Sequence, residues 1–176
     1  PPPPAPEPTP APTETRTQVP TPDVQLTKTA ACEQSIGSVE RFELDSEHMQ
    51  GPQWISVYTP PCSDPHHEDG YPVLYTFHGQ LFDDSMWFDL GAAEYLEGMI
   101  AAGQAQPFLI VSIFEEYYYR AVRGNKFPDA VIEEIIPWVD GNFNSCPERA
   151  CRAVGGISRG AAWAMRLGLT FPNLFS

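Results

Sequence analysis

The chain has 176 residues and a formal net charge of −13, and this length is enough for one domain with a sizeable core. Residues 1–28 contribute only −1, so the rest of the chain carries about −12. Such an acidic chain argues against nucleic acid or an anionic membrane as a partner. No stretch approaches the roughly 18 consecutive apolar residues that a membrane span needs.

Residues 1–28 have the composition of a disordered tail or linker. Ten of the 20 prolines fall in the first 22 positions, among Thr, Glu and Ala. Such a stretch lacks apolar residues to bury and adopts extended, polyproline-like conformations. Two interpretations stay open: a stalk between a cell-surface anchor and the domain, or a terminus without a role. Residues 29–176 are expected to form the folded part.

Four segments before residue 115 are typical of strands. Val39 to Leu44 and Trp54 to Tyr58 alternate apolar and polar residues, as half-buried strands do. Tyr71 to His78 and Phe108 to Phe114 are nearly continuous apolar runs. Such runs are typical of strands that are covered on both faces, as in a parallel sheet.

Helical segments lie between and after these strands. Residues 90–102 are rich in Ala, Leu and Met and are followed by Gly103, a suitable helix C-cap. Residues 129–139 repeat apolar side chains at helical spacing. A short strand is expected over 152–157 and a helix of small residues over 160–169. The alternation predicts an α/β fold with a doubly wound, mostly parallel sheet.

The chain contains four cysteines, without a CxxC metal or redox pattern. An even number fits two disulfides formed in an oxidising compartment, which would make the protein secreted, periplasmic or surface-anchored. Cys146 and Cys151 bracket a short loop that could bring them together, and Cys32 and Cys62 would then form the second pair. The alternative is four unrelated thiols.

The most informative motif is Gly156-Ile157-Ser158-Arg159-Gly160. It follows an expected strand and opens an expected helix, the setting of a nucleophile elbow. In such an elbow a strained backbone lifts the serine hydroxyl above the sheet, and the glycines allow strand and helix to approach closely. We therefore predict Ser158 as a nucleophile, with an incidental serine in a glycine-rich turn as the alternative.

Several segments, in a consistent order, resemble one enzyme family. They are 57–61, 71–79 (Tyr-Pro-Val-Leu-Tyr-Thr-Phe-His-Gly), 134–140, 152–160 (Arg-Ala-Val-Gly-Gly-Ile-Ser-Arg-Gly) and 171–175. From about Gly37 to Ser176 the chain resembles the putative-esterase family of α/β-hydrolases, which includes enterochelin esterases, feruloyl esterases, S-formylglutathione hydrolase and mycolyltransferases. The resemblance implies a serine carboxylic-ester hydrolase without cofactor or metal. Its expected substrate is a small-molecule or carbohydrate-linked ester.

The segment His78-Gly79-Gln80 ends the first apolar strand and is the expected oxyanion loop. An acyl-transfer enzyme needs two backbone N–H donors for the oxyanion, and the candidates are those of Arg159 and Gln80. His78 precedes the nucleophile, whereas α/β-hydrolases place the catalytic histidine after the serine. We therefore interpret His78 as structural, with a role as catalytic base as the alternative.

Three residues are candidate substrate contacts. Glu115 and Tyr117 follow the strand that ends at Phe114, at the end where such folds bind ligands, and Trp87 follows the oxyanion loop. Core packing is the alternative for each. The cluster 66–69 (His-His-Glu-Asp) could be mistaken for a metal site, but four adjacent loop residues rarely converge on one ion, so no metal site is predicted.

The chain departs from the family pattern after the nucleophile. No Asp, Glu or His occurs in the 18 residues after Ser158, whereas the resemblance places the acid and the histidine well after the serine, on loops that follow later strands. Without a base the hydroxyl is not deprotonated efficiently. We therefore expect a fragment of a serine esterase that is inactive by itself. The alternatives are an acyltransferase of the same fold and a non-catalytic binding domain, against which the intact elbow and His-Gly loop weigh.

Overall fold

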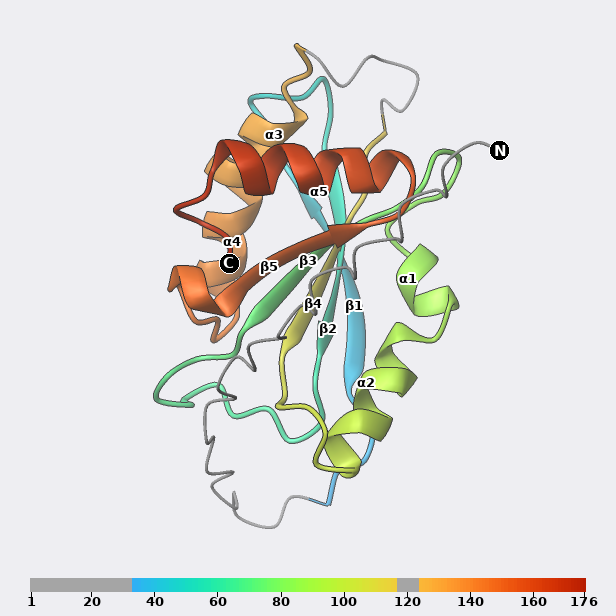
Figure 1. Ribbon diagram of the computed structural model, residues 1–176, viewed down its shortest axis with the longest axis vertical. Coiled ribbons are helices and arrows are strands. Elements are labelled where there is room, and N and C mark those ends of the chain that lie inside the picture. Colours follow the sequence, from blue (N-terminus) through green and yellow to red (C-terminus); the bar gives the residue numbers. More distant parts are fainter. Residues whose placement is uncertain (1–32, 117–123) are drawn as a thin grey trace, which may run out of the picture. The chain divides into compact units, whose positions relative to one another are not determined.

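The computed structural model describes residues 33–116 and 124–176, and a five-stranded mixed sheet forms their centre (Figure 1). The strand order is β1-β2-β4-β3-β5. β1 pairs with β2 and β2 with β4 in antiparallel fashion, whereas β3 runs parallel to both β4 and β5. The strand bounds are β1 Ser38–Leu44, β2 Gln53–Thr59, β3 Val73–Phe77, β4 Leu109–Ile113 and β5 Arg152–Gly156.

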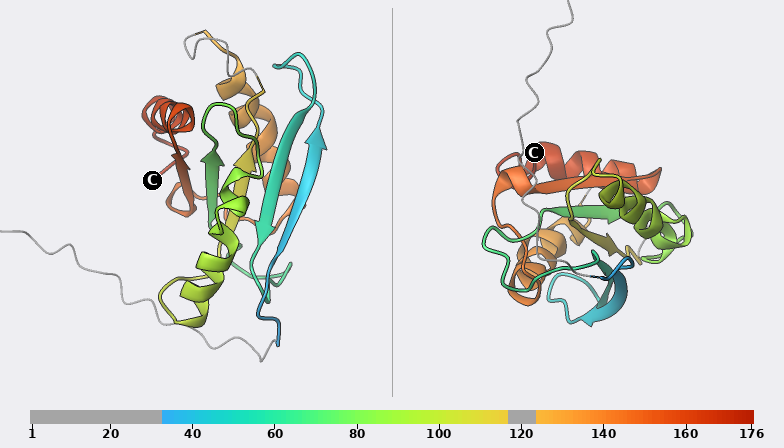
Figure 2. Two further views of the ribbon diagram at one scale, coloured as in Figure 1. Left: turned by 90° about the vertical axis from the view of Figure 1, so that its right-hand side faces the viewer. Right: turned by 90° about the horizontal axis from the view of Figure 1, so that it is seen from below.

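Helices cover both faces of this sheet (Figure 2). On one face Leu96 of α2 packs against Tyr58 and Ile110. The other face carries the larger core, in which the side chains of Tyr75 and Phe77 are fully buried. The helices are α1 Met86–Asp89 and α2 Ala92–Ala101 on the first face, and α3 Phe127–Ala130, η1 Val131–Ile135, α4 Ile136–Asn142 and α5 Arg159–Thr170 on the second.

The elements expected from the sequence are present, so the α/β-hydrolase prediction is confirmed. The described sheet is mixed rather than mostly parallel, because β1 and β2 form an antiparallel edge. The helix expected over 129–139 runs from 127 to 142 and contains a π-helical segment, η1. Pro137 lies just after this segment and lacks the N–H that a regular α-helical ladder needs.

A disulfide joins Cys146 and Cys151, as predicted, and ties the segment before β5. The predicted partner of Cys62, Cys32, lies outside the described residues, so that pairing stays a prediction. The proline-rich tail over 1–28 and Tyr117 also lie outside them.

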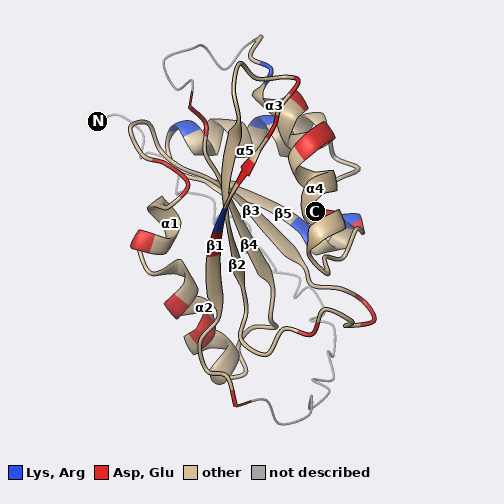
Figure 3. Ribbon diagram, turned by 180° about the vertical axis from the view of Figure 1, so that it is seen from behind, with Lys and Arg blue, Asp and Glu red and all other residues tan. Residues whose placement is uncertain are grey.

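Acidic side chains predominate on the α1–α2 side of the molecule (Figure 3). The sequence contains no Lys or Arg between Phe42 and Tyr119. A Lys or Arg that pairs with an acidic group of this segment must therefore come from residues up to Arg41 or from the chain after residue 119. Within the described ranges, no helix is long and apolar enough to cross a membrane.

Candidate active site

The turn from β5 into α5 holds Ser158 in a strained backbone conformation. Its φ and ψ are 54° and −115°, a region that non-glycine residues rarely occupy. The N–H of Gly160 donates to the carbonyl of Ile157 at 2.8 Å and closes the turn. Ser158 itself is exposed. An exposed serine on a sharp strand-to-helix turn is the arrangement of a nucleophile elbow.

The two glycines of the motif are required by close backbone contacts. A Cβ atom at Gly156 would lie 2.4 Å from the carbonyl carbon of Gly160. A Cβ atom at Gly160 would lie 2.2 Å from the carbonyl oxygen of Phe77 and 2.6 Å from that of His78. Backbone atoms cannot move aside as flexible side chains do. The glycines thus allow the elbow to lie directly against the end of β3, where the expected oxyanion loop begins.

His78 lies buried between this loop and the end of β4. The backbone N–H of Glu115 donates to its Nε2 at 2.8 Å. Because a backbone N–H can only donate, Nε2 is the acceptor, and the proton of the neutral ring is on Nδ1. Nδ1 lies 2.7 Å from the carbonyl oxygen of Gly79 and donates to it. Both ring nitrogens are therefore engaged with the backbone.

The loop after β3, which is the expected oxyanion loop, makes a tight turn after His78. The N–H of Phe82 donates to the Gly79 carbonyl at 3.2 Å, and Leu81 within the turn has a φ of 72°. Gln80, whose N–H is the second expected oxyanion donor, is exposed. The N–H of Ser85 donates to Asp83 at 2.8 Å and lowers the pKa of that carboxyl group. These contacts order the loop from both sides of Gln80.

Glu115 is 2% exposed and bridges the loop and the elbow. Its carboxylate accepts two hydrogen bonds from Arg159, one from Nε and one from Nη2 at 2.9 Å. It also accepts a bond from Trp163 Nε1 at 3.1 Å. The sequence predicted Glu115 as a substrate contact; its contacts in the structure are with protein groups, and a substrate contact stays a prediction.

Trp87, the other described candidate for substrate binding, is half-buried, and its Nε1 donates to the Phe77 carbonyl at 3.3 Å. Its ring lines an apolar pocket of about 520 Å³ between α2 and the sheet, which also reaches Gly155 and Gly156 of β5. The structure thus brings Trp87 close to the elbow strand. A contact with substrate stays a prediction.

A buried carboxylate that the sequence reasoning missed secures the far end of the loop. Asp84 is 1% exposed and accepts hydrogen bonds from Arg41 Nε and Nη2, both at 2.8 Å, and from Ser56 Oγ at 2.6 Å. Asp84 thereby fixes the β3–α1 loop to β1 and β2. The only sequence signal was an acidic pair, Asp83-Asp84, and its partners are not local.

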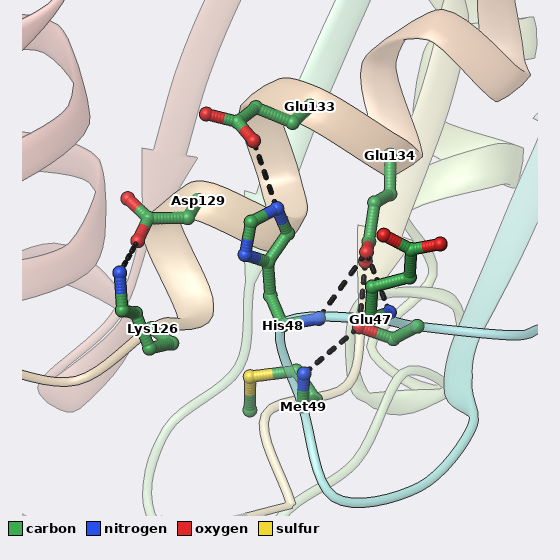
Figure 4. A network of polar contacts seen from close by, with 8 residues as sticks. Glu47, His48, Met49, Lys126, Asp129, Glu133 and Glu134 are labelled. Carbon is green, nitrogen blue, oxygen red and sulfur yellow. Dashed lines mark hydrogen bonds and ion pairs between the residues drawn. The ribbon is translucent and has the colours of Figure 1, made fainter.

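A second polar network, also missed, holds the β1–β2 loop on the π-helical segment (Figure 4). Glu134 accepts from the N–H groups of Glu47 and His48 at 2.8 and 3.3 Å and from Ser46 Oγ at 2.6 Å. His48 Nε2 lies 2.8 Å from Glu133. We name residues 46–49 with Glu133 and Glu134 the β1–β2 clasp. The start of β2 lies beside the end of β4, because the Phe114 N–H donates to the Trp54 carbonyl at 2.9 Å. The clasp residues 46–49 precede β2 and therefore lie at the carboxyl end of β4.

The described residues contain no group of three or more His, Cys, Asp or Glu side chains arranged to hold a metal ion. The cluster 66–69 lies in an exposed loop, and the N–H of His66 donates to Asp64 at 2.8 Å. The chemistry that the described site offers is that of an exposed hydroxyl beside backbone donors.

Comparison with known proteins finds feruloyl esterases among the similar proteins. An endo-1,4-beta-xylanase/feruloyl esterase of Xylanibacter ruminicola is 26% identical over 149 residues, which cover 79% of this chain and 20% of that protein. A ferulic acid esterase structure from Anaeromyces mucronatus has a TM-score of 0.70 at 20% identity, covering 88% of this chain and 61% of that one.

A feruloyl esterase module from Clostridium thermocellum, complexed with sinapinate, has a TM-score of 0.71 at 18% identity, covering 81% of this chain and 52% of that one. At these identities the structures show a shared fold. The chain spans a fifth of the curated relative and less than two thirds of each structure. The family model described as Putative esterase matches residues 46–176, most of the chain, and the chain belongs to that family.

Proposed function

We propose that the protein hydrolyses carboxylic esters through an acyl-enzyme formed on Ser158. The observation that carries the proposal is the strained backbone of Ser158, held between two glycines that have no room for a Cβ atom. Strain of this kind persists only where the surrounding structure enforces it, and it gathers at active sites. Membership of the esterase family and feruloyl esterase relatives support the same reaction class.

In the proposed reaction the Ser158 hydroxyl oxygen attacks the ester carbonyl carbon while a base takes its proton. The carbonyl oxygen becomes an oxyanion, and the N–H groups of Arg159 and Gln80 donate to it. Arg159 begins α5, so its N–H belongs to the group of helix N-terminal donors that lack an intrahelical acceptor. Collapse of the intermediate expels the alcohol and leaves the acyl group on Ser158, from which water removes it.

The base of this mechanism is not His78. Its Nε2 already accepts the Glu115 N–H, and its Nδ1 donates to the Gly79 carbonyl, so neither nitrogen has a lone pair for the serine proton. No His, Asp or Glu follows Ser158 in the sequence. We propose that the catalytic histidine and its acid come from residues outside these 176, and that the 176-residue chain alone is inactive.

The proposed substrate class is an ester of an aromatic acid with a carbohydrate. The names of the relatives, feruloyl and ferulic acid esterases, point to such esters. The Cys146–Cys151 disulfide supports an extracytoplasmic site for the protein, because disulfides persist in oxidising compartments. Both are proposals for the whole protein.

The test is covalent labelling of the full-length protein with a fluorophosphonate, followed by mass spectrometry of the peptide that carries Ser158. We expect a phosphonylated Ser158 and hydrolysis of p-nitrophenyl acetate, with both abolished in Ser158→Ala. The 176-residue chain, folded to the same circular dichroism spectrum, is the matched control and should remain unlabelled. Labelling of that short chain would refute the proposal about the base, and an unlabelled full-length protein would refute the esterase proposal.

A further inference from the structure

We infer that Glu115 is a positioning residue that holds both donors of the proposed oxyanion hole, one through the Arg159 side chain and one through His78. The inference rests on the proposed function and deepens it. Glu115 follows β4, Arg159 opens α5 and His78 follows β3. The three residues are far apart in sequence and converge at the carboxyl end of the sheet.

The link to the first donor is a two-point ion pair. Arg159 Nε and Nη2 bind separate oxygens of the Glu115 carboxylate, and the two side chains are only 13% and 3% exposed. A guanidinium held at two points in a buried site has little freedom. Because the backbone N–H of Arg159 is the donor next to the nucleophile, fixing its side chain also restrains that N–H.

The link to the second donor passes through one peptide plane. The N–H of Glu115 fixes the His78 ring, and His78 Nδ1 donates to the carbonyl oxygen of Gly79. The Gly79 carbonyl and the Gln80 N–H belong to the same planar trans peptide, in which they point in opposite directions. Orienting the carbonyl toward His78 therefore orients the Gln80 N–H away from it. One residue, Glu115, thus restrains both N–H groups.

A positioning role for the Glu115–Arg159 pair predicts different kinetics from a role in packing alone. Oxyanion donors act on the tetrahedral state and contribute little to ground-state binding. Breaking the Glu115–Arg159 pair should therefore lower kcat while leaving KM nearly unchanged. Arg166 offers an internal comparison, because its guanidinium, like that of Arg159, lies over the Trp163 ring, at 5.8 Å from the centroid.

The test uses the full-length protein and the double variant Glu115→Gln/Arg159→Met. This variant buries no unpaired charge and leaves the Gln carbonyl as an acceptor for Trp163 Nε1, so it is designed to fold. We expect its melting temperature to stay near that of the wild type. The kcat on p-nitrophenyl acetate should fall at least about tenfold with KM within about twofold. The affinity for a trifluoromethyl ketone, which forms a tetrahedral adduct with serine, should fall by a similar factor.

Arg159→Lys is the second variant, because it keeps the positive charge and loses the two-point contact. We expect it to fold and to lose kcat to a smaller extent, and we expect Arg166→Met to retain wild-type kcat. The inference would be overturned if the double variant kept the wild-type kcat and ketone affinity. Should the double variant not fold, the same result in Arg159→Lys would overturn it. A wild-type protein that is not labelled at Ser158 would instead overturn the proposed function, and the inference with it.

Discussion

Two polar networks hold loops at the carboxyl end of the sheet, and they differ in how deeply their charges are buried. In one, the carboxylate of Glu115 is paired with Arg159 under almost complete burial. In the other, the β1–β2 clasp, Glu134 is partly exposed and the Glu133 side chain is 63% exposed. Both use a carboxylate that accepts several hydrogen bonds from a segment distant in the sequence, helix α5 for Glu115 and the β1–β2 loop for Glu134.

The difference in burial changes how much each contact contributes to the stability of the fold. An uncompensated charge inside a protein is expensive, so removing one partner of a buried pair destabilises strongly. Water replaces a lost partner in an exposed network at small cost. The network beside Ser158 is therefore the one in which small changes are expected to have large effects, in keeping with a site whose geometry must be held closely.

The largest effect is expected for Glu115→Gln alone. It removes the carboxylate charge that pairs with the buried Arg159 guanidinium, and the free energy of unfolding should fall by on the order of 3 kcal/mol. Urea unfolding followed by circular dichroism measures it. The matched control is Glu116→Gln at the exposed neighbouring position, which should change stability by less than about 0.5 kcal/mol. Equal effects at both positions would contradict the contrast between buried and exposed charges.

A second prediction sets a glycine of the elbow against a glycine of the β1–β2 loop. Gly160→Ala places a Cβ atom 2.2 Å from the Phe77 carbonyl oxygen, and the resulting overpacking should cost about 2–3 kcal/mol. Gly51→Ala meets nothing within 4 Å and should stay within about 0.5 kcal/mol of the wild type. Thermal unfolding of the two variants side by side provides the measurement. A tolerated alanine at 160 would show that the elbow can relax away from β3.

The order and type of the elements could be predicted from the sequence because they depend on local patterns. The apolar run of β4 and the Gly-x-Ser-x-Gly turn are each read from neighbouring residues. The contacts of the site could not be predicted in this way. Glu115 and Arg159 are 44 positions apart, and Arg41 and Asp84 are 43 apart. Such pairs form only because of the strand order and register of this sheet.

Glu115 is an example of a residue whose place, but not whose contacts, could be predicted from the sequence. Its place after an apolar strand correctly indicated the carboxyl end of the sheet. Its buried side chain pairs with a cation from another element, Arg159 of α5, which lies 44 positions further along the chain. The π-helical segment that carries Glu134 is likewise not distinguishable by periodicity from an α-helix of the same residues.

A smaller effect is expected in the β1–β2 clasp. Glu134→Gln removes the charge that strengthens its bonds from Glu47, His48 and Ser46, and should lower the free energy of unfolding by about 1 kcal/mol. Glu133→Gln, which weakens the exposed contact with His48, should cost no more than a few tenths of a kcal/mol. Urea unfolding at low and high salt checks both. A larger loss for Glu133→Gln than for Glu134→Gln would reverse our ranking of the two contacts.

The smallest effect is expected at Asp83, an exposed residue of the loop between β3 and α1. Its pKa is lowered in the folded protein, chiefly by the hydrogen bond from the Ser85 N–H. A lowered carboxyl pKa stabilises the fold at pH values above the unfolded pKa of about 4, and this contribution is lost as the pH falls through the folded value.

Asp83→Asn should therefore be less stable than the wild type at pH 7, by a few tenths of a kcal/mol because of solvent screening. The difference should vanish below the folded pKa, where the wild-type carboxyl group is also uncharged. Urea unfolding of both proteins between pH 7 and pH 2 measures the gap, and a gap that widens toward low pH would show that the charge of Asp83 opposes folding.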